Sequence, residues 1–262
     1  MCVLAFAWRA HPRWQLVVAG NRDELHARPT LPLARWDEPD HVLAGRDLQS
    51  GGSWLGVSEE GRFAVVTNLR GFGLPVPGRV SRGALVSDFL SGSGRYVDPE
   101  LAELSDFNPF NLIVADRKRA CFLSNRPEKI RSTLAPGIYG LSNGALDEPW
   151  PKTLRLKELL LEWIVDGVWD PGALLDGLRE ETLPNVGIDP EEPSDVPQEP
   201  SASPIFIHGP IYGTRCSTFV GIDDHGRGTI VERRYDPAGD STGQTALSFR
   251  FWRLTNASPT RP

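Results

Sequence analysis

The chain consists of short apolar runs, each of which ends in polar residues or glycine. Runs rich in Val, Leu, Phe and Trp at 2–9 and 14–19 flank the turn His11-Pro12-Arg13 and predict an N-terminal β-hairpin. Residues 53–67 and 110–124 predict two further hairpins, with polar turns at 59–61 and 116–118. Single strands are expected at 138–141, 205–208, 212–223, 229–234 and 247–254.

Helical spacing of apolar residues is found in blocks between these strands. Leu85, Val86, Phe89 and Leu90 predict a helix that opens at 81–83, and the most regular helix is expected from about 150 to 165. Shorter helices are predicted at 99–104 and 171–180. Residues 25–52 are interpreted as a long irregular connection and 71–79 as a Gly/Pro-rich flap. The pattern favours an α+β fold with helices packed outside antiparallel sheets.

Composition limits the classes of function. The 262 residues carry a net charge of −6, which disfavours a nucleic-acid surface, and no apolar run is long enough to span a membrane. We expect one domain over 1–254, containing a loop rich in proline and acidic residues at 184–204, followed by a disordered tail at 255–262. Three widely spaced cysteines indicate reduced thiols in a cytoplasmic protein, and five scattered histidines predict neither a metal nor a cofactor.

Cys2 is the candidate nucleophile. Removal of Met1 would leave a free α-amine and a thiol on one residue, with reference pKa values of about 7.7–8.0 and about 8.5. The amine can then act as the base for its own side chain, as in N-terminal nucleophile enzymes. The alternative is that Cys2 is a small buried residue at the start of a strand. Cys121 and Cys216 lie in apolar runs and are expected to be inert core thiols.

Polar residues follow several predicted strands, at 20–24, 68–71 and 142–144. The N-terminal hairpin returns the first of these clusters toward Cys2. Asn amides such as those of Asn68 and Asn143 can donate to a developing oxyanion, and Arg215 can hold carboxylate partners by bidentate contacts. Each has a purely structural alternative, since Asn is common before Gly in turns and Arg215 would serve equally as a salt-bridge residue.

Ten short motifs, taken in order from residue 1 to about residue 234, resemble the NRDE family, which is also called the Transport and Golgi organisation protein 2 family. They are Met1-Cys2, Gly20-Asn21-Arg22-Asp23-Glu24, Arg28-Pro29-Thr30, Trp54-Leu55-Gly56, Thr67-Asn68-Leu69-Arg70, Ser81-Arg82-Gly83, Phe110-Asn111-Leu112, Gly140-Leu141-Ser142-Asn143, Pro149-Trp150-Pro151-Lys152 and Tyr212-Gly213-Thr214-Arg215.

That family is similar to cysteine N-terminal nucleophile hydrolases such as bile-salt hydrolase and penicillin V acylase. The resemblance implies a four-layer αββα sandwich and a set of site residues. Cys2 would be nucleophile and base, Asn21 stands where the hydrolases carry an arginine, and Glu24 where they carry the aspartate that contacts the α-amine. Asn68 and Asn143 match two site asparagines, and Arg215 matches a late arginine that steadies the site.

The departure at Asn21 bears on the chemistry. Without a cation beside the thiol its pKa would stay higher, and Arg22 would substitute only if the turn re-aims it. Arg22, Asp23 and Arg70 lie in the same motifs and are candidates for substrate binding.

Two functions follow from the resemblance. One is a Cys2-dependent hydrolase or acyltransferase that acts on an amide or thioester of a small acyl substrate. The other is a non-catalytic carrier of haem, lipid or acyl-CoA on the same fold. The sequence specifies neither the substrate nor the oligomeric state.

Overall fold

Thirteen strands form two antiparallel sheets in the computed structural model, which describes residues 2–182 and 204–251. The first sheet, in spatial order, is β10 (Gly137–Leu141), β1 (Cys2–His11), β2 (Trp14–Leu25), β11 (Tyr212–Asp223), β12 (Arg227–Tyr235) and β13 (Ser241–Arg250). The second is β3 (Thr30–Arg35), β4 (Val42–Asp47), β5 (Leu55–Ser58), β6 (Arg62–Asn68), β7 (Phe110–Asp116), β8 (Ala120–Ser124) and β9 (Ile130–Leu134).

The two sheets pack face to face because both faces of β1 are apolar. Leu4 and Phe6 point toward the second sheet, where Phe6 packs against Phe63 with ring centroids 5.9 Å apart. Val3 and Ala5 alternate with them and point toward the helices on the outer face. A strand that is apolar on both faces is typical of the interior of a layered fold, so β1 and β2 lie in the middle of the molecule.

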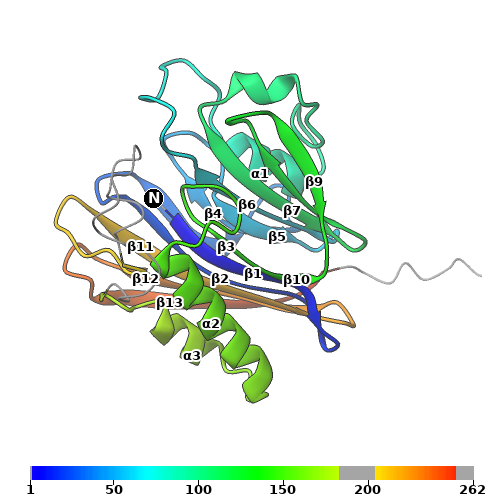
Figure 1. Cartoon of the computed structure of the whole chain (residues 1–262), viewed down its shortest axis with the longest axis vertical. Helices are drawn as coiled ribbons and strands as arrows, with labels where there is room; N and C mark the ends of the chain where they lie inside the picture. The colour runs from blue at the N-terminus through cyan, green and yellow to red at the C-terminus, as the bar shows by residue number, and fades with distance from the viewer. Residues whose placement is uncertain (1, 183–203, 252–262) are drawn as a thin grey trace, which may run out of the picture.

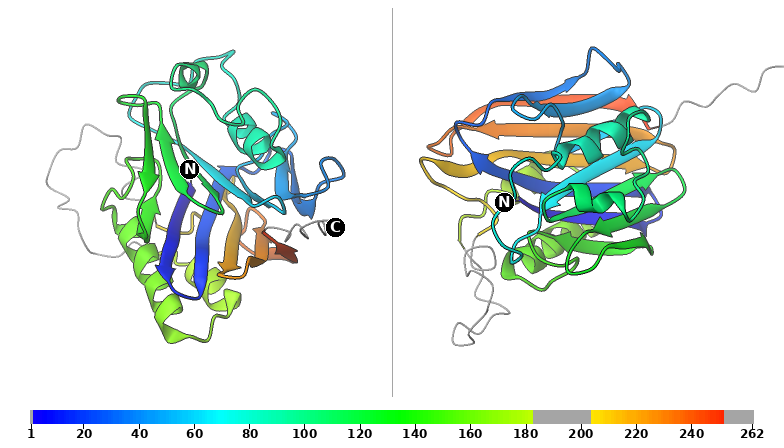
Figure 2. Two further views of the ribbon diagram at one scale, coloured as in Figure 1. Left: turned by 90° about the vertical axis from the view of Figure 1, so that its right-hand side faces the viewer. Right: turned by 90° about the horizontal axis from the view of Figure 1, so that it is seen from above.

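Helices cover the outer face of each sheet, as Figure 1 shows from the side. Helix α1 (Gly83–Ser91) and the short 3₁₀ helix η1 (Glu103–Asp106) lie over the second sheet, and α2 (Pro151–Asp166) and α3 (Pro171–Gly177) lie under the first. Helix α2 begins with proline at its first position and ends at Gly167 in a left-handed conformation with φ 75°. The two views of Figure 2 show the same layers edge-on and from above. The expected αββα sandwich is confirmed.

Most predicted hairpins and helices are present, with three corrections. Residues 25–52 are not irregular, because they contain β3 and β4, and β9 was not predicted at all. Residues 205–208 form no strand. They are apolar because Ile205 and Phe206 pack beneath the first sheet, each 1% exposed. The predicted loop at 184–204, apart from its last residue, and the predicted tail at 255–262 lie outside the described residues.

Candidate active site

Cys2 lies at the end of the first sheet, where a polar cavity of about 240 Å³ opens. Both sheets and the start of α1 contribute to its lining. The first sheet supplies Cys2, Arg22 and Glu24, and the second supplies Asn68. In Figure 1 the amino terminus marks this end of the sandwich, and the β1–β2 turn lies at the opposite end.

The pleat of β2 decides which polar residue stands beside Cys2. Cys2 pairs with Arg22 in the β1–β2 register, and Arg22 pairs in turn with Cys216 of β11. Arg22 is 6% exposed, and its guanidinium lies 4.3 Å from the centre of the Trp54 ring and 3.9 Å from the carboxylate of Asp47. The cation next to the thiol is therefore Arg22, which ordinary strand alternation aims there without any special turn.

Asn21 faces the opposite side of the sheet, so the prediction that it lines the Cys2 pocket is wrong. Its side-chain amide donates to the carbonyls of Leu178 and Ile205 at 2.8 and 2.9 Å, and Ser217 Oγ donates to Asn21 Oδ1 at 2.7 Å. Successive strand residues point to opposite faces, so Asn21 and Arg22 cannot both face the cavity. Asn21 joins β2 to the segments under the sheet.

Asp23 is a buried carboxylate whose pKa is influenced by the charge at the amino terminus. Burial raises the pKa of Asp23, and the positive charge at the amino terminus and the Thr214 hydroxyl oppose that rise. Thr214 donates to Asp23 Oδ1 at 2.7 Å, and the backbone N–H of Asp23 donates to the Cys2 thiol. Glu24 lines the cavity, but its carboxylate lies 3.8 Å from Arg28 and accepts the backbone N–H of Leu25. Asp23 is therefore a candidate for the role beside the α-amine that the resemblance assigned to Glu24.

Asn68 and Asn143 lie next to each other but differ in orientation. The Asn68 side chain lines the cavity, and within the described residues its amide makes no hydrogen bond to protein. Asn143 is 1% exposed, does not line the cavity, and donates through Nδ2 to the Asn68 carbonyl at 2.7 Å. The N–H of Arg70 donates to the Asn143 carbonyl at 2.9 Å, so Asn143 holds the end of β6 in place.

Two hydroxyls that were not predicted connect Cys2 to the second sheet. Ser142 Oγ donates to the Cys2 carbonyl at 2.7 Å, and Thr67 Oγ1 donates to the Ser142 carbonyl at 2.8 Å. Both residues are 2% exposed or less. They lie inside the motifs 67–70 and 140–143, which is the sequence signal that could have identified them.

Arg215 does not line the cavity, although it was predicted to. It lies at an irregularity between Thr214 and Cys216 in the β2–β11 pairing, and its guanidinium donates to the carbonyls of Leu25 and Arg28 at 2.8 and 3.1 Å. Arg215 therefore fixes the turn that carries Arg28 into the cavity. Arg70 does not line the Cys2 cavity but lines two others, of about 600 and 520 Å³, the first of which shares Asn68 and Arg82 with it.

The charge state of the thiol is set by competing effects. Burial raises the pKa of Cys2 above its ordinary value, and the positive amino terminus, the Asp23 N–H and Arg22 oppose that rise. Lys152, in the first turn of α2, is 1% exposed and was also missed. Burial lowers the pKa of Lys152 to about 8, and the charges of Asp23 and Cys2 work against this decrease. A buried ammonium group thus belongs to the same electrostatic cluster as the thiol.

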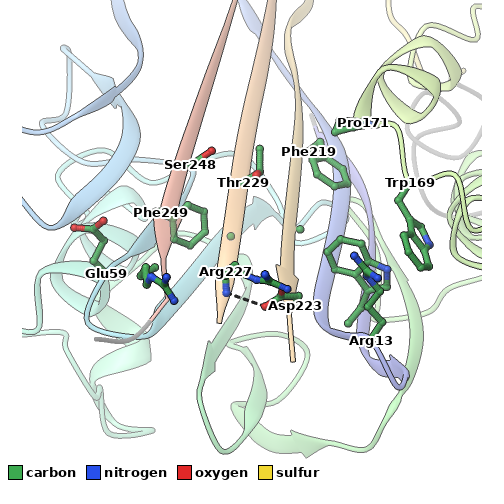
Figure 3. A pocket seen from close by; sticks show the side chains of 14 residues that line it. Arg13, Glu59, Trp169, Pro171, Phe219, Asp223, Arg227, Thr229, Ser248 and Phe249 are labelled. Atoms are coloured by element: carbon green, nitrogen blue, oxygen red, sulfur yellow. Dashed lines mark hydrogen bonds and ion pairs between the residues drawn. The ribbon is translucent and has the colours of Figure 1, made fainter. Parts of the chain in front are cut away.

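A larger cavity of about 760 Å³ lies at the opposite end of the first sheet, at the β1–β2 turn (Figure 3). Arg13 stacks on Trp169 at 4.2 Å from the ring centre, and Arg227 forms an ion pair of 2.7 Å with Asp223. Its lining contains no cysteine and no histidine. Volume alone therefore does not make it the reaction site.

Residues 2–182 and 204–251 contain no group of three His, Cys, Asp or Glu side chains placed to hold a metal ion. None of their helices combines the length and apolar character needed to cross a membrane.

The family follows from comparison with known proteins. The family model described as Transport and Golgi organisation 2 matches residues 1–237. The chain belongs to this family. The bovine Transport and Golgi organization protein 2 homolog is 35% identical over 256 residues, which cover 89% of this chain and 92% of the relative. The human homolog is 34% identical with the same coverage.

Solved structures agree on the fold at low identity. A penicillin V acylase from Agrobacterium tumefaciens is 12% identical with a TM-score of 0.50, and the match covers 89% of this chain and 83% of the acylase. The C2A mutant of a conjugated bile acid hydrolase from Clostridium perfringens is 8% identical with a TM-score of 0.50, covering 94% and 92%. The chain therefore shares the sandwich fold of these two enzymes.

Proposed function

We propose that the chain is a Cys2-dependent hydrolase or acyltransferase for an amide or thioester of a small acyl substrate. The observation that carries the proposal is the cavity itself. It presents the Cys2 thiol, the guanidinium of Arg22 beside it, and the Asn68 amide, which within the described residues has no protein partner. The names of the two fold neighbours, an acylase and a hydrolase, are compatible with this chemistry. Three cysteines without disulfide partners suit a cytoplasmic location.

The reaction would begin after Met1 is removed. The α-amine of Cys2 accepts the thiol proton, Sγ forms a bond to the substrate carbonyl carbon, and the carbonyl electron pair moves to oxygen. Asn68 Nδ2 donates to that oxyanion. When the tetrahedral intermediate collapses, the amine or thiol leaving group takes the proton from the α-ammonium group. Water or an acceptor nucleophile then cleaves the Cys2 thioester and restores the thiol.

Neighbouring charges would support this cycle. Arg22 beside the thiol favours the thiolate, which offsets part of the effect of burial on the Cys2 pKa. Asp23 would hold the α-ammonium group between proton transfers. In this proposal Asn143 and Arg215 act as positioning residues, through Asn68 and Arg28 respectively.

The alternative is a carrier of haem, lipid or acyl-CoA. Two observations favour it. Burial raises the Cys2 pKa, so the thiol stays largely protonated at neutral pH while Met1 is attached. The cavity of about 520 Å³ beyond the 68–71 segment is lined by apolar groups that include Phe72, Phe122 and Trp150, and such a wall suits an apolar ligand.

Mass spectrometry of the mature N-terminus is the first test, because a retained Met1 blocks the amine and rules out the enzyme. The second compares wild type, Cys2→Ala and a variant with one residue added before Cys2, using acyl and lactone probes. We expect the added residue to lower acyl transfer about 10²–10⁴-fold while leaving acyl or haem binding unchanged. If wild type shows no acyl transfer, and Cys2 reacts with iodoacetamide no faster than Cys121 and Cys216, the carrier replaces the enzyme.

A further inference from the structure

The motif Ser81-Arg82-Gly83 has no role in the chemistry above, yet the structure places it at the Cys2 cavity. All three residues line the cavity, and Arg82 is the residue immediately before α1. The start of α1 is pressed against the segment before β5. A Cβ added to Gly52 would lie 2.4 Å from the carbonyl carbon of Gly83. This close backbone packing fixes the position from which Arg82 enters the cavity.

The charges that line this cavity do not balance internally. Four arginines and three carboxylates line it. The carboxylate of Asp47 lies 2.7 Å from Arg28 and 3.9 Å from Arg22, and Glu24 lies 3.8 Å from Arg28. The third carboxylate, Asp23, interacts with the positive amino terminus. These carboxylates therefore have cationic partners other than the two remaining arginines.

Arg79 and Arg82 are those two remaining cations. Within the described part of the chain neither forms an ion pair with a carboxylate. Arg82 donates through one nitrogen to the carbonyl of Pro109 at 3.0 Å, and Arg79 donates to the carbonyl of Ser105. A guanidinium has five N–H donors, so each anchor leaves most of the donors available to a ligand. The two carbonyls hold the side chains in place without neutralising them.

Arg82 is also electrostatically close to the thiol. Burial lowers the pKa of Arg82, and the negative charges that Cys2 and Glu24 can carry oppose that decrease. A half-buried guanidinium without a carboxylate is costly to hold charged, and a bound anion would relieve that cost.

We propose that Arg82, assisted by Arg79, binds an anionic group of the substrate beside Cys2. The ligand chemistry is a carboxylate or a phosphate, both of which match the planar fork of arginine. This inference rests on the proposed function and narrows its substrate class to amides or thioesters that carry a negative charge close to the scissile carbonyl. A cavity of about 240 Å³ suits such a compact group better than a long apolar chain.

The binding test needs no turnover. Alkylation of Cys2 by iodoacetamide is followed by peptide mass spectrometry in the presence of phosphate, acetate or neutral acetamide at constant ionic strength. We expect phosphate or acetate to protect Cys2 and acetamide not to. Arg82→Gln should weaken protection about 10-fold or more, since hydrogen bonds to charged groups are among the stronger ones. Arg82→Lys keeps the charge but not the planar fork, so its protection should fall between those of wild type and Arg82→Gln. Arg95→Gln is the matched control, because Arg95 follows the far end of α1 and pairs with Glu103 and Asp106.

The turnover test uses an N-acylglycine and its glycinamide with the same acyl group. We expect wild type to prefer the anionic member of the pair, and Arg82→Gln to lose that preference mainly through KM. Anion protection that depends on Arg82, with no turnover of any probe, would reject the proposed enzyme and keep the anion site. Equal protection by acetate and acetamide in wild type would overturn the inference, and that comparison stands even if Arg82→Gln fails to fold. Equal protection of wild type and a folded Arg82→Gln variant would overturn it as well.

Discussion

Replacement of Lys152 by Met tests whether a buried ammonium group belongs to the Cys2 cluster. Lys152 is 1% exposed, so its ionisation is not screened by solvent. Burial lowers its pKa from 10.5 to about 8. At about 1.36 kcal/mol per pH unit, that difference corresponds to about 3 kcal/mol. Methionine has a similar length and helix propensity, so the substitution removes the charge with little change in packing.

The direction of this pH effect on stability depends on whether the folded or the unfolded chain binds the Lys152 proton more tightly. Between pH 8 and 10.5 the unfolded chain holds the Lys152 proton and the folded chain releases it, so this residue makes stability rise with pH over that window. Cys2, Cys216 and Tyr212 have raised pKa values and act in the opposite direction above about pH 9. Their contribution is shared by both proteins and is largely removed by taking the difference between wild type and Lys152→Met.

The measurement is urea unfolding of both proteins at half-unit intervals from pH 7 to 10.5. We expect the free energy of unfolding of wild type, relative to Lys152→Met, to rise by about 3 kcal/mol across this range. Lys157→Met is the matched control one helical turn and a half along α2, where the ammonium pairs with Asp147 at 2.6 Å and is partly exposed. The reasoning would be refuted if the difference in free energy of unfolding between wild type and Lys152→Met did not change with pH. It would also be refuted if the corresponding difference for Lys157→Met rose equally.

Three further outcomes are expected. Asn21→Ala should lower the free energy of unfolding by about 3 kcal/mol in urea, because it leaves buried carbonyls without donors, and should leave the iodoacetamide rate of Cys2 unchanged. Arg22→Gln, in contrast, should slow the alkylation of Cys2 at pH 7, because the thiol loses its neighbouring cation; a pH–rate profile of alkylation would show this. Gly52→Ala should destabilise by about 1–3 kcal/mol in thermal melts, because its Cβ would meet the backbone of Gly83.

The sequence predicted the buried parts of the fold better than its edges. β1, β6 and β7 are apolar over most of their length, and periodicity identifies such strands. β9 has four exposed residues out of five, and β3 has a mostly exposed pattern interrupted by Pro32, so neither resembles a buried strand. An edge strand with so few buried residues carries no hydrophobic pattern by which it could be predicted.

The candidate site shows the same limit at the level of single side chains. The N-terminal hairpin predicted that the ends of β1 and β2 lie together, and the family resemblance matched Asn68 of β6 to the same site, where it shares a cavity with Cys2. To predict that Arg22, and not Asn21, faces Cys2, one must know which face of the sheet each β2 side chain points to, and this depends on the β1–β2 register. Lys152 comes from a helix packed under the sheet, and no local pattern relates it to Cys2.

The hydroxyl chain from Thr67 through Ser142 to the Cys2 carbonyl crosses from one sheet to the other. The two walls of the cavity thus belong to separate halves of the sandwich, and only the closed sandwich brings them into register. Under mild denaturant, partial separation of the sheets would disperse the cavity while the strands within each sheet stay paired. The protection that a bound ligand gives Cys2 against alkylation would then be lost at a lower urea concentration than the far-ultraviolet circular dichroism signal. The thiol would thus report closure of the two sheets rather than secondary structure.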